Sequence, residues 1–298
     1  MNPTLELIKT PFDEIFLPSE GLFYPSKKSR IKIRHMTGND ELLLSSPYMS
    51  QDGTALKLLI NNLVLEPNLE YDELLVCDRN AILLFLRSSS YGDDIEMEFV
   101  CPGCQIQATG KFLISSIETK DITQYPDENG NYTYKTEKLK ICFAPVRLKN
   151  EQLIKSGNLI DRYMAQITSI NDSTDKNIIH KHILSMRAKE SKSLREYMDK
   201  VEPGFQEIVM FTCPDCQEEI KDTLKIDENF LKLPDSHILV VREECFLCYY
   251  YGKGGITRGQ VYEMTIDERR WTINRITKEV EKQNEAEQKA MDKAKSKR

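Results

Sequence analysis

Two seven-residue stretches decide the predicted fold: FVCPGCQ at residues 99–105 and FTCPDCQ at residues 211–217, which begin 112 positions apart. Each lies between short segments in which apolar and polar side chains alternate, as in DIEMEFVCPGCQIQATGKF and FQEIVMFTCPDCQEEIKDTLKI. Alternation with a period of two is typical of strands, so each stretch predicts the tip of a β-hairpin. The proline after the first cysteine fixes φ and lacks an N–H, which favours a tight, knuckle-like turn.

Each tip supplies two cysteines in a C-x-x-C spacing, which indicates a metal site or a redox pair. A structural zinc site needs four ligands in a closed tetrahedron, so one tip is incomplete and two tips complete each other. We therefore predict one structural Zn²⁺ per chain, bound by Cys101, Cys104, Cys213 and Cys216. The pairs of a simple zinc ribbon are roughly 15–20 residues apart, so here the metal would join distant parts of one fold.

Two other interpretations of these cysteines compete with the zinc site. In the first, the stretches are unconnected surface turns with reduced thiols, which leaves their close sequence match unexplained. In the second, one pair is a thioredoxin-like redox disulfide. That interpretation requires the motif at a strand-to-helix junction, whereas both copies lie between strand-like segments.

A third pair among the eight cysteines, Cys245 and Cys248, lies in EECFLCYYYG, with no proline and with large apolar neighbours. On a helix the two thiols would lie on the same side, which permits metal binding. No fourth pair is available to complete a second site. We expect this pair to face a core, and the sequence leaves open whether it touches metal.

Composition limits the classes of function. The 298-residue chain has a formal net charge of -6, which argues against general binding to a phosphate backbone. Its longest apolar runs, AILLFL and CFLCYYY, are far shorter than the roughly 20 residues that cross a bilayer. The start, MNPTLELIKTPFDE, lacks the basic and apolar regions of a secretory signal, so we expect no membrane association and a reducing compartment.

The sequence contains no recognisable enzyme signature. Its four histidines, His35, His180, His182 and His237, lie neither in H-E-x-x-H nor beside a known nucleophile motif. No P-loop and no G-x-G-x-x-G is present. We therefore predict no catalytic residues, no bound organic cofactor and no small-molecule substrate.

The predicted fold class is α+β. A mixed body at residues 1–233 is followed by a helical C-terminal interaction region with a polar tail at residues 234–298. Within the body we expect five parts: a helical block at 36–90, a knuckle hairpin at 94–113, a strand pair at 131–148, a helical insertion at 150–200 and a second knuckle hairpin at 205–225.

Capping residues predict several helix starts, among them a second, weaker capping box of Thr257 with Gln260. Thr37 precedes ELLLSS, Asp78 could cap RNAILLFLRSS, and Thr265 begins a capping box that predicts a helix from Ile266. Beyond residue 280 the chain consists mainly of Glu, Lys, Gln and Ala, with little to bury. This tail is expected to be either a solvated helix or disordered.

Several stretches of the sequence are similar to those of a known protein family. They are LPSEGLFYP from Leu17, IKIRHMTGNDELLLSS, CDRNAILLFLRSSSYGDD leading into CPGC, and the later CPDC. Together they resemble the baseplate hub assembly proteins of T4-type contractile-tailed bacteriophages over most of residues 15–230. The segment YYYGKGGITRGQVYEMTIDERRW is similar to the C-terminal segments of phage tail assembly chaperones. Gln instead of Gly after the second cysteine departs from the commonest knuckle pattern and predicts a strained turn.

The resemblance implies a non-enzymatic protein that helps to build a tail baseplate hub in the host cytoplasm. Its partners would be other phage baseplate or tail hub proteins, and retention in the virion tail stays open. We expect a structural or chaperone-like role, in which zinc holds the body together. The alternative is a zinc-ribbon regulator that binds nucleic acid, but acidic residues surround Lys111, Lys221 and Lys225 beside the knuckles.

Overall fold

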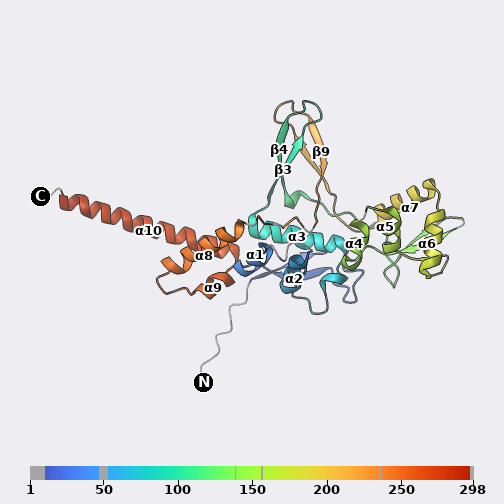
Figure 1. Ribbon diagram of the computed structural model, residues 1–298, viewed down its shortest axis with the longest axis horizontal. Helices are drawn as coiled ribbons and strands as arrows, with labels where there is room; N and C mark the ends of the chain where they lie inside the picture. The colour runs from blue at the N-terminus through green and yellow to red at the C-terminus, as the bar shows by residue number, and fades with distance from the viewer. Residues whose placement is uncertain are drawn as a thin grey trace, which may run out of the picture. The chain divides into compact units, whose positions relative to one another are not determined.

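The computed structural model describes residues 11–46, 53–137, 139–155, 157–227, 229–231, 233–234 and 236–295 (Figure 1). The chain divides into two compact units. Unit 1 consists of Met1–Asp13, Arg34–Leu63 and Leu231–Arg298, and unit 2 consists of Glu14–Ile33 and Val64–Phe230. The expected helical block at 36–90 is therefore divided, because its first two helices group with the C-terminal region.

The fold class is α+β, as predicted, with small antiparallel sheets and a helical C-terminal region. The described helices are α1 Gly38–Leu44, α2 Thr54–Leu63, α3 Val76–Tyr91, α4 Glu151–Lys155, α5 Leu159–Gln166, α6 Lys176–Ser185, α7 Ala188–Val201, α8 His237–Tyr251, α9 Arg258–Glu263 and α10 Ile266–Lys295. The described strands are β1 Phe12–Phe16, β2 Arg30–Arg34, β3 Asp94–Val100, β4 Gln107–Leu113, β5 Tyr132–Lys135, β6 Lys140–Phe143, β7 Ile167–Ile170, β8 Ile208–Thr212 and β9 Glu219–Thr223. None of the described helices is both long enough and apolar enough to span a bilayer.

The strands form three pairs and one three-stranded sheet, and the latter differs from expectation. Strands β1 and β2, β3 and β4, and β8 and β9 pair with each other, whereas β5, β6 and β7 lie in that order in one sheet. Within residues 150–200 we expected two helical stretches separated by a loop at residues 171–175, but β7 precedes this loop and pairs with β6 through Ile141↔Ile170. Its sequence, ITSI, is too short to show a strand period, so tertiary pairing decides its conformation.

Unit 2 is organised around α3, whose Ile82, Leu83 and Leu86 are completely buried. The prediction that Asp78 caps this helix is wrong, because the helix begins two residues earlier, at Val76. Asp78 instead lies buried in the first turn and joins the helix to the preceding LPSEGLFYP segment.

The buried Asp78 carboxylate accepts three hydrogen bonds. They come from the Ser19 amide at 3.1 Å, the Ser19 hydroxyl at 2.7 Å and the Tyr24 hydroxyl at 2.5 Å. The Tyr24 oxygen also accepts from the Leu75 amide at 2.9 Å, next to the helix N-terminus. Burial raises the pKa of Asp78, although these donors oppose the shift. One polar network therefore anchors the LPSEGLFYP segment to α3.

Unit 1 contains a buried group of charged side chains. Glu41 of α1 and Arg269 of α10 are both completely buried and form an ion pair. Glu41 also lies 2.9 Å from His237 Nε2, and Arg269 Nε donates to Glu244 Oε2 at 2.8 Å. Removing one member of such a pair would leave a buried charge without its partner, so the group fixes α1 against α8 and α10.

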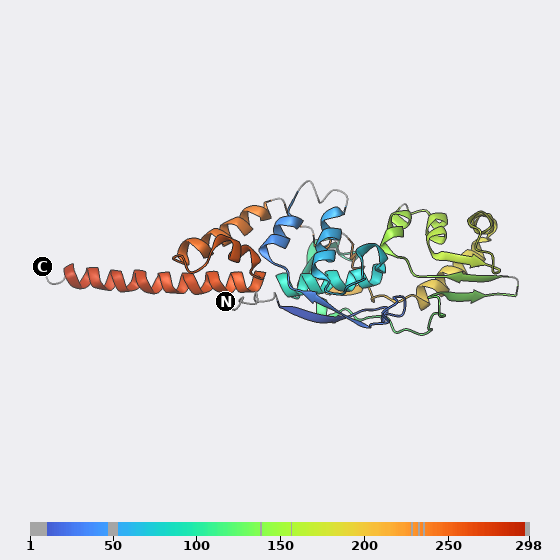
Figure 2. The same ribbon diagram turned by 90° about the horizontal axis from the view of Figure 1, so that it is seen from below.

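The long C-terminal helix begins where the capping box predicts. The Thr265 hydroxyl accepts a hydrogen bond from the Glu268 amide at 3.3 Å, and α10 starts at Ile266. The tail beyond residue 280 was expected to be either a solvated helix or disordered, and it is helical. Helix α10 continues without a break to Lys295 (Figure 2).

We predict that the hydrogen-bond network around Asp78 stabilises the folded protein. Tyr24→Phe removes the hydroxyl that donates to Asp78 and leaves the Leu75 amide without that acceptor. We expect the free energy of unfolding in urea to fall by about 1–3 kcal/mol, because a buried polar group loses its partner. Tyr125→Phe is the matched control, since Tyr125 is 64% exposed and should change it by less than about 0.5 kcal/mol. Equal losses in the two variants would contradict the anchoring role.

Candidate metal centre

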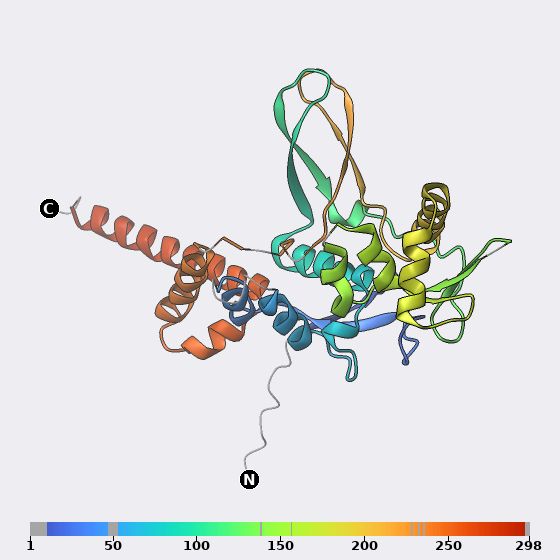
Figure 3. The ribbon, with the colours of Figure 1, turned by 45° about the vertical axis from the view of Figure 1, so that its right-hand side comes forward.

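The two cysteine stretches form the tips of two antiparallel hairpins within unit 2. Strands β3 and β4 pair from Asp94↔Leu113 to Val100↔Gln107. Strands β8 and β9 pair from Ile208↔Thr223 to Thr212↔Glu219. The hairpins lie side by side and their tips meet at one end (Figure 3).

The two tips repeat the same backbone geometry. In each, one hydrogen bond closes the hairpin and a second spans the turn. These bonds are Cys101 N to Ile106 O (3.0 Å) and Gln105 N to Cys101 O (2.9 Å) in the first tip, and Cys213 N to Glu218 O (2.9 Å) and Gln217 N to Cys213 O (3.1 Å) in the second. The sequence repeat is therefore also a structural repeat.

The glutamine after the second cysteine occupies a strained position in both tips, as its sequence predicts. Gln105 and Gln217 have φ values of 61° and 63°, in the left-handed region that favours glycine. Each side-chain amide donates to the carbonyl of the proline in its own tip, Pro102 at 3.0 Å and Pro214 at 3.5 Å. This local bond partly offsets the backbone strain.

The structure brings all four predicted ligands together. Cys101 Sγ lies 3.5 Å from Cys216 Sγ, and Cys104 Sγ lies 3.7 Å from Cys213 Sγ. All four sulfurs lie within 4.8 Å of one another. Four sulfurs about 2.3 Å from a central Zn²⁺ would be about 3.8 Å apart, so the arrangement has the size of a tetrahedral site.

The thiols of the cluster differ in acidity. The amides of Cys216 and Asp215 donate to Cys213 and lower its pKa to about 7. The Ile106 amide lowers the pKa of Cys104, but desolvation and the three neighbouring cysteines raise it overall to about 12. Each further thiolate is repelled by those already formed, so full deprotonation requires a cation to offset the negative charge.

Aromatic side chains lie directly beneath the cluster. Phe99 and Phe211, the first residues of the two repeated stretches, stack with their ring centroids 5.5 Å apart and an interplanar angle of 8°. Phe112 of β4 packs against Phe211 at 6.1 Å, and Gly110 lies against the same ring. Sequence reasoning gave these phenylalanines no role, although each lies two residues before the first cysteine of its stretch.

The third cysteine pair lies elsewhere. Cys245 and Cys248 of α8 are completely buried in the core of unit 1, with Val241 and Val261, as expected from their apolar neighbours. Across the described ranges, the four tip cysteines are the only group of three or more metal-type ligands close enough to share an ion.

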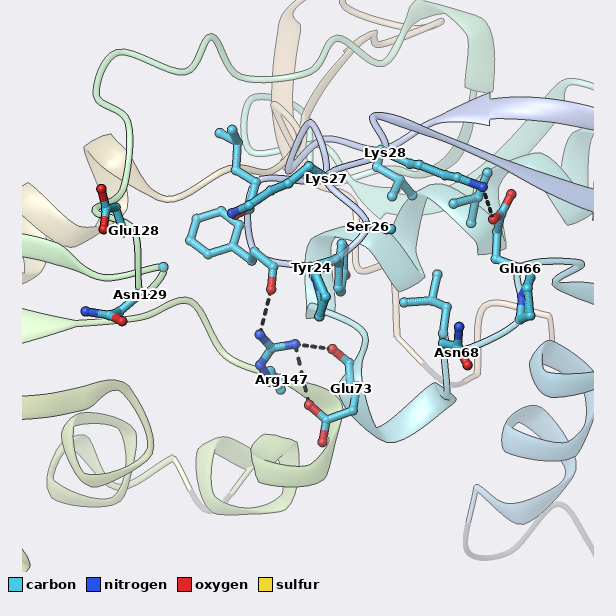
Figure 4. A pocket seen from close by; sticks show the side chains of 18 residues that line it. Tyr24, Ser26, Lys27, Lys28, Glu66, Asn68, Glu73, Glu128, Asn129 and Arg147 are labelled. Carbon is cyan, nitrogen blue, oxygen red and sulfur yellow. Dashed lines mark hydrogen bonds and ion pairs between the residues drawn. The ribbon is translucent and has the colours of Figure 1, made fainter.

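A cavity of about 790 Å³ also lies in unit 2, lined by residues from outside the two hairpins (Figure 4). Arg147 donates to the carbonyls of Glu73 at 2.6 Å and Phe23 at 2.9 Å, and Lys28 forms an ion pair with Glu66 at 2.7 Å. These charged groups are thus engaged with the walls of the cavity. They hold its surrounding loops together and form no recognisable catalytic set.

Two remote segments of the chain thus bring four cysteines together at a candidate metal centre. Residues 21–232 match the sequence model of the family described as T4 bacteriophage base plate protein. This match covers more than half of the chain, so the chain belongs to that family, and the resemblance to T4-type baseplate proteins is confirmed. No curated protein and no solved structure gives a significant match.

We predict that the close packing of the two hairpins requires glycine at position 110. A Cβ atom added at Gly110 would lie 2.1 Å from Cδ1 of Phe211, a steric clash with the edge of a rigid aromatic ring. We expect Gly110→Ala to lower the free energy of unfolding by about 1–3 kcal/mol, because the hairpins must move apart. Gly259→Ala is the control, since its Cβ would meet no atom within 4 Å, and it should be neutral or slightly stabilising. Identical urea unfolding curves for the Gly110 variant and the unmodified protein would contradict this packing.

Proposed function

We propose that this chain is a structural or chaperone-like protein in the assembly of a contractile-tail baseplate hub, and that it contains one structural Zn²⁺. Membership of the base plate family supports the assembly role. The mutual distances of the four sulfurs, all within 4.8 Å, are the observation that carries the metal site.

The four cysteine ligands favour zinc as the metal, and they favour a structural over a catalytic role for it. Four thiolates are soft ligands, and a tetrahedral set of four is typical of zinc or of an iron–sulfur centre. A catalytic zinc keeps an open position for water or substrate, whereas Cys101, Cys104, Cys213 and Cys216 would close the coordination shell. The bound ion would hold the two hairpin tips together, and no reaction is required of it.

The proposed partners are other baseplate or tail hub proteins of the same phage. Assembly would take place in the host cytoplasm, and the protein could stay in the tail baseplate of the virion. The C-terminal region, residues 234–298, is the proposed contact region. Its long helix α10 exposes Trp271 and Met291, with 66% and 57% of their surface accessible, and aromatic residues and methionine are enriched at protein interfaces.

Charge on the paired hairpins favours protein over nucleic acid as the partner. Residues 94–113 and 208–223 carry two lysines, Lys111 and Lys221, against seven acidic residues: Asp94, Glu96, Glu98, Asp215, Glu218, Glu219 and Asp222. Lys111 is itself paired with Glu96 at 2.7 Å. A phosphate backbone would be repelled by this surface, which weighs against the alternative of a zinc-ribbon regulator.

Elemental analysis of the purified protein tests the zinc site. We expect one zinc per chain, and we expect Cys213→Ser to lose it, because three thiolates no longer close the tetrahedron. The variant should also unfold at a lower temperature, since metal binding contributes to folding. Cys142→Ser is the control, because Cys142 lies in β6 outside the cluster and should leave the zinc content unchanged. Absence of zinc from the unmodified protein, or its retention by Cys213→Ser, would contradict the proposal.

Mixing experiments test the assembly role. The purified chain should co-migrate with at least one candidate hub protein of the same phage, and binding should change little with DNA or RNA present. No co-migration in any combination would count heavily against the role. Salt-dependent binding to DNA or RNA at physiological ionic strength would favour the nucleic-acid alternative instead.

A further inference from the structure

Glu202 lies beside the place where the two hairpins join the body of unit 2. The segment that follows it leads into β8, and this segment pairs with the one that follows β4. The pairing consists of the Lys120 amide donating to the Gly204 carbonyl and the Gln206 amide donating to the Glu118 carbonyl, both at 2.8 Å. We call these two paired segments the hairpin base. A change at Glu202 therefore acts on both hairpins at once.

The Glu202 side chain belongs to a series of polar contacts between α5 and α7. Its carboxyl oxygen Oε1 accepts a hydrogen bond from Nε2 of Gln166, the last residue of α5. Oε1 of Gln166 accepts from Arg162 Nε at 3.2 Å, and Arg162 Nη2 donates to Asp199 Oδ1 at 2.8 Å. The arginine is thus engaged by Asp199, whereas the donor to the Glu202 carboxyl group is a neutral amide.

The surroundings of Glu202 disfavour a negative charge. Glu202 follows the last residue of α7, so it lies at the helix end that carries partial negative charge. It also lines a cavity of about 240 Å³. The titratable and charged groups that face it come from every neighbouring element: Cys77 of α3, Tyr132 of β5, Arg162 of α5, Asp199 of α7, and Lys120 and Glu207 of the hairpin base.

These surroundings change the acidity of Glu202. Burial raises the pKa of Glu202 to about 7, and the negative charge of Asp199 adds to the rise. Arg162, Lys120 and the Gln166 amide oppose this rise in pKa without cancelling it. The carboxyl group therefore gains or loses its proton close to neutral pH.

We propose that Glu202 is a pH-dependent switch that controls opening of the hairpin base. With its proton, the carboxyl group is neutral and maintains the contact between α5 and α7. When the proton passes to water, a negative charge remains in the cavity beside Asp199, and opening of the hairpin base exposes this charge to solvent. The switch requires neither a metal nor a partner protein, so it can fail without the proposed function, and the reverse.

The closed state is predicted to weaken as pH rises. The pKa of Glu202 is about 7 when the base is closed, and it returns toward the ordinary value of 4.5 when opening exposes the side chain to water. The stabilisation of the closed state is thus fully present below about pH 4.5. It is lost progressively as pH rises toward 7, and the closed state stays weakened above that pH.

Amide hydrogen exchange of the full-length protein, followed by mass spectrometry at pH 5 and pH 8, tests the switch. Glu202→Gln is uncharged at every pH and keeps an oxygen that can accept from Gln166. At pH 8, peptides that contain Lys120 and Gln206 should exchange at least tenfold more slowly in this variant than in the unmodified protein. At pH 5 the difference should shrink to a few-fold, because the closed protein then holds the Glu202 proton.

The control is Glu196→Gln, the same substitution on the same helix at a side chain that is 66% exposed. It should exchange like the unmodified protein at both pH values. Comparison at equal pH removes the intrinsic pH dependence of exchange and any effect of acid on the cysteines. Equal exchange of Glu202→Gln and the unmodified protein at pH 8, or a difference as large at pH 5 as at pH 8, would overturn the proposal.

A second variant tests the geometry while keeping Glu202. Asp199→Asn removes the neighbouring negative charge and frees Arg162 to act on Glu202, and both effects lower the pKa of Glu202. The pH above which opening of the hairpin base increases no further should therefore fall by at least about 0.5 units. An unchanged or higher value would overturn the assigned arrangement of Asp199, Arg162 and Glu202.

Discussion

The meeting of the two hairpin tips is the contact on which the candidate centre depends. Cys101 and Cys213 are buried at this contact, and all four sulfurs lie within 4.8 Å. Four thiolates at such distances repel one another, so a divalent cation is the natural source of net attraction. Beneath the sulfurs, the stack of Phe99 on Phe211 contributes apolar contact that is present with or without an ion. Metal and aromatic contacts would thus act on the same two segments.

The central feature of the site was predictable from sequence because it is a repeat. Both copies of the stretch contain the cysteines, the proline and the phenylalanine, and ligand chemistry requires that two incomplete pairs combine. The hairpins, the start of α10 at Ile266 and the burial of Cys245 and Cys248 follow similarly from local patterns. These features depend only on the spacing of residues that are close together in the sequence, so they can be predicted from the sequence alone.

The remaining features depend on contacts between residues far apart in sequence. Strand β7 exists because β6 pairs with it, and its four residues alone show no period. Asp78 resembles a helix cap, yet it accepts hydrogen bonds from Ser19 and Tyr24, more than fifty residues earlier. Similarly, α1 joins the C-terminal helices through the pair of Glu41 and Arg269. None of these partners could be chosen from local sequence, because many charged and hydroxyl-bearing residues compete for each role.

The coordination shell of the proposed Zn²⁺ would show directly whether both hairpin tips bind one ion. X-ray absorption at the zinc edge, measured on the purified full-length protein, reports the type, number and distance of the atoms bound to the ion. We expect four sulfur neighbours at about 2.3 Å and no lighter ligands. Two sulfurs accompanied by nitrogen or oxygen at about 2.0–2.1 Å would mean that only one tip binds the ion, which would contradict the joining of the two hairpins.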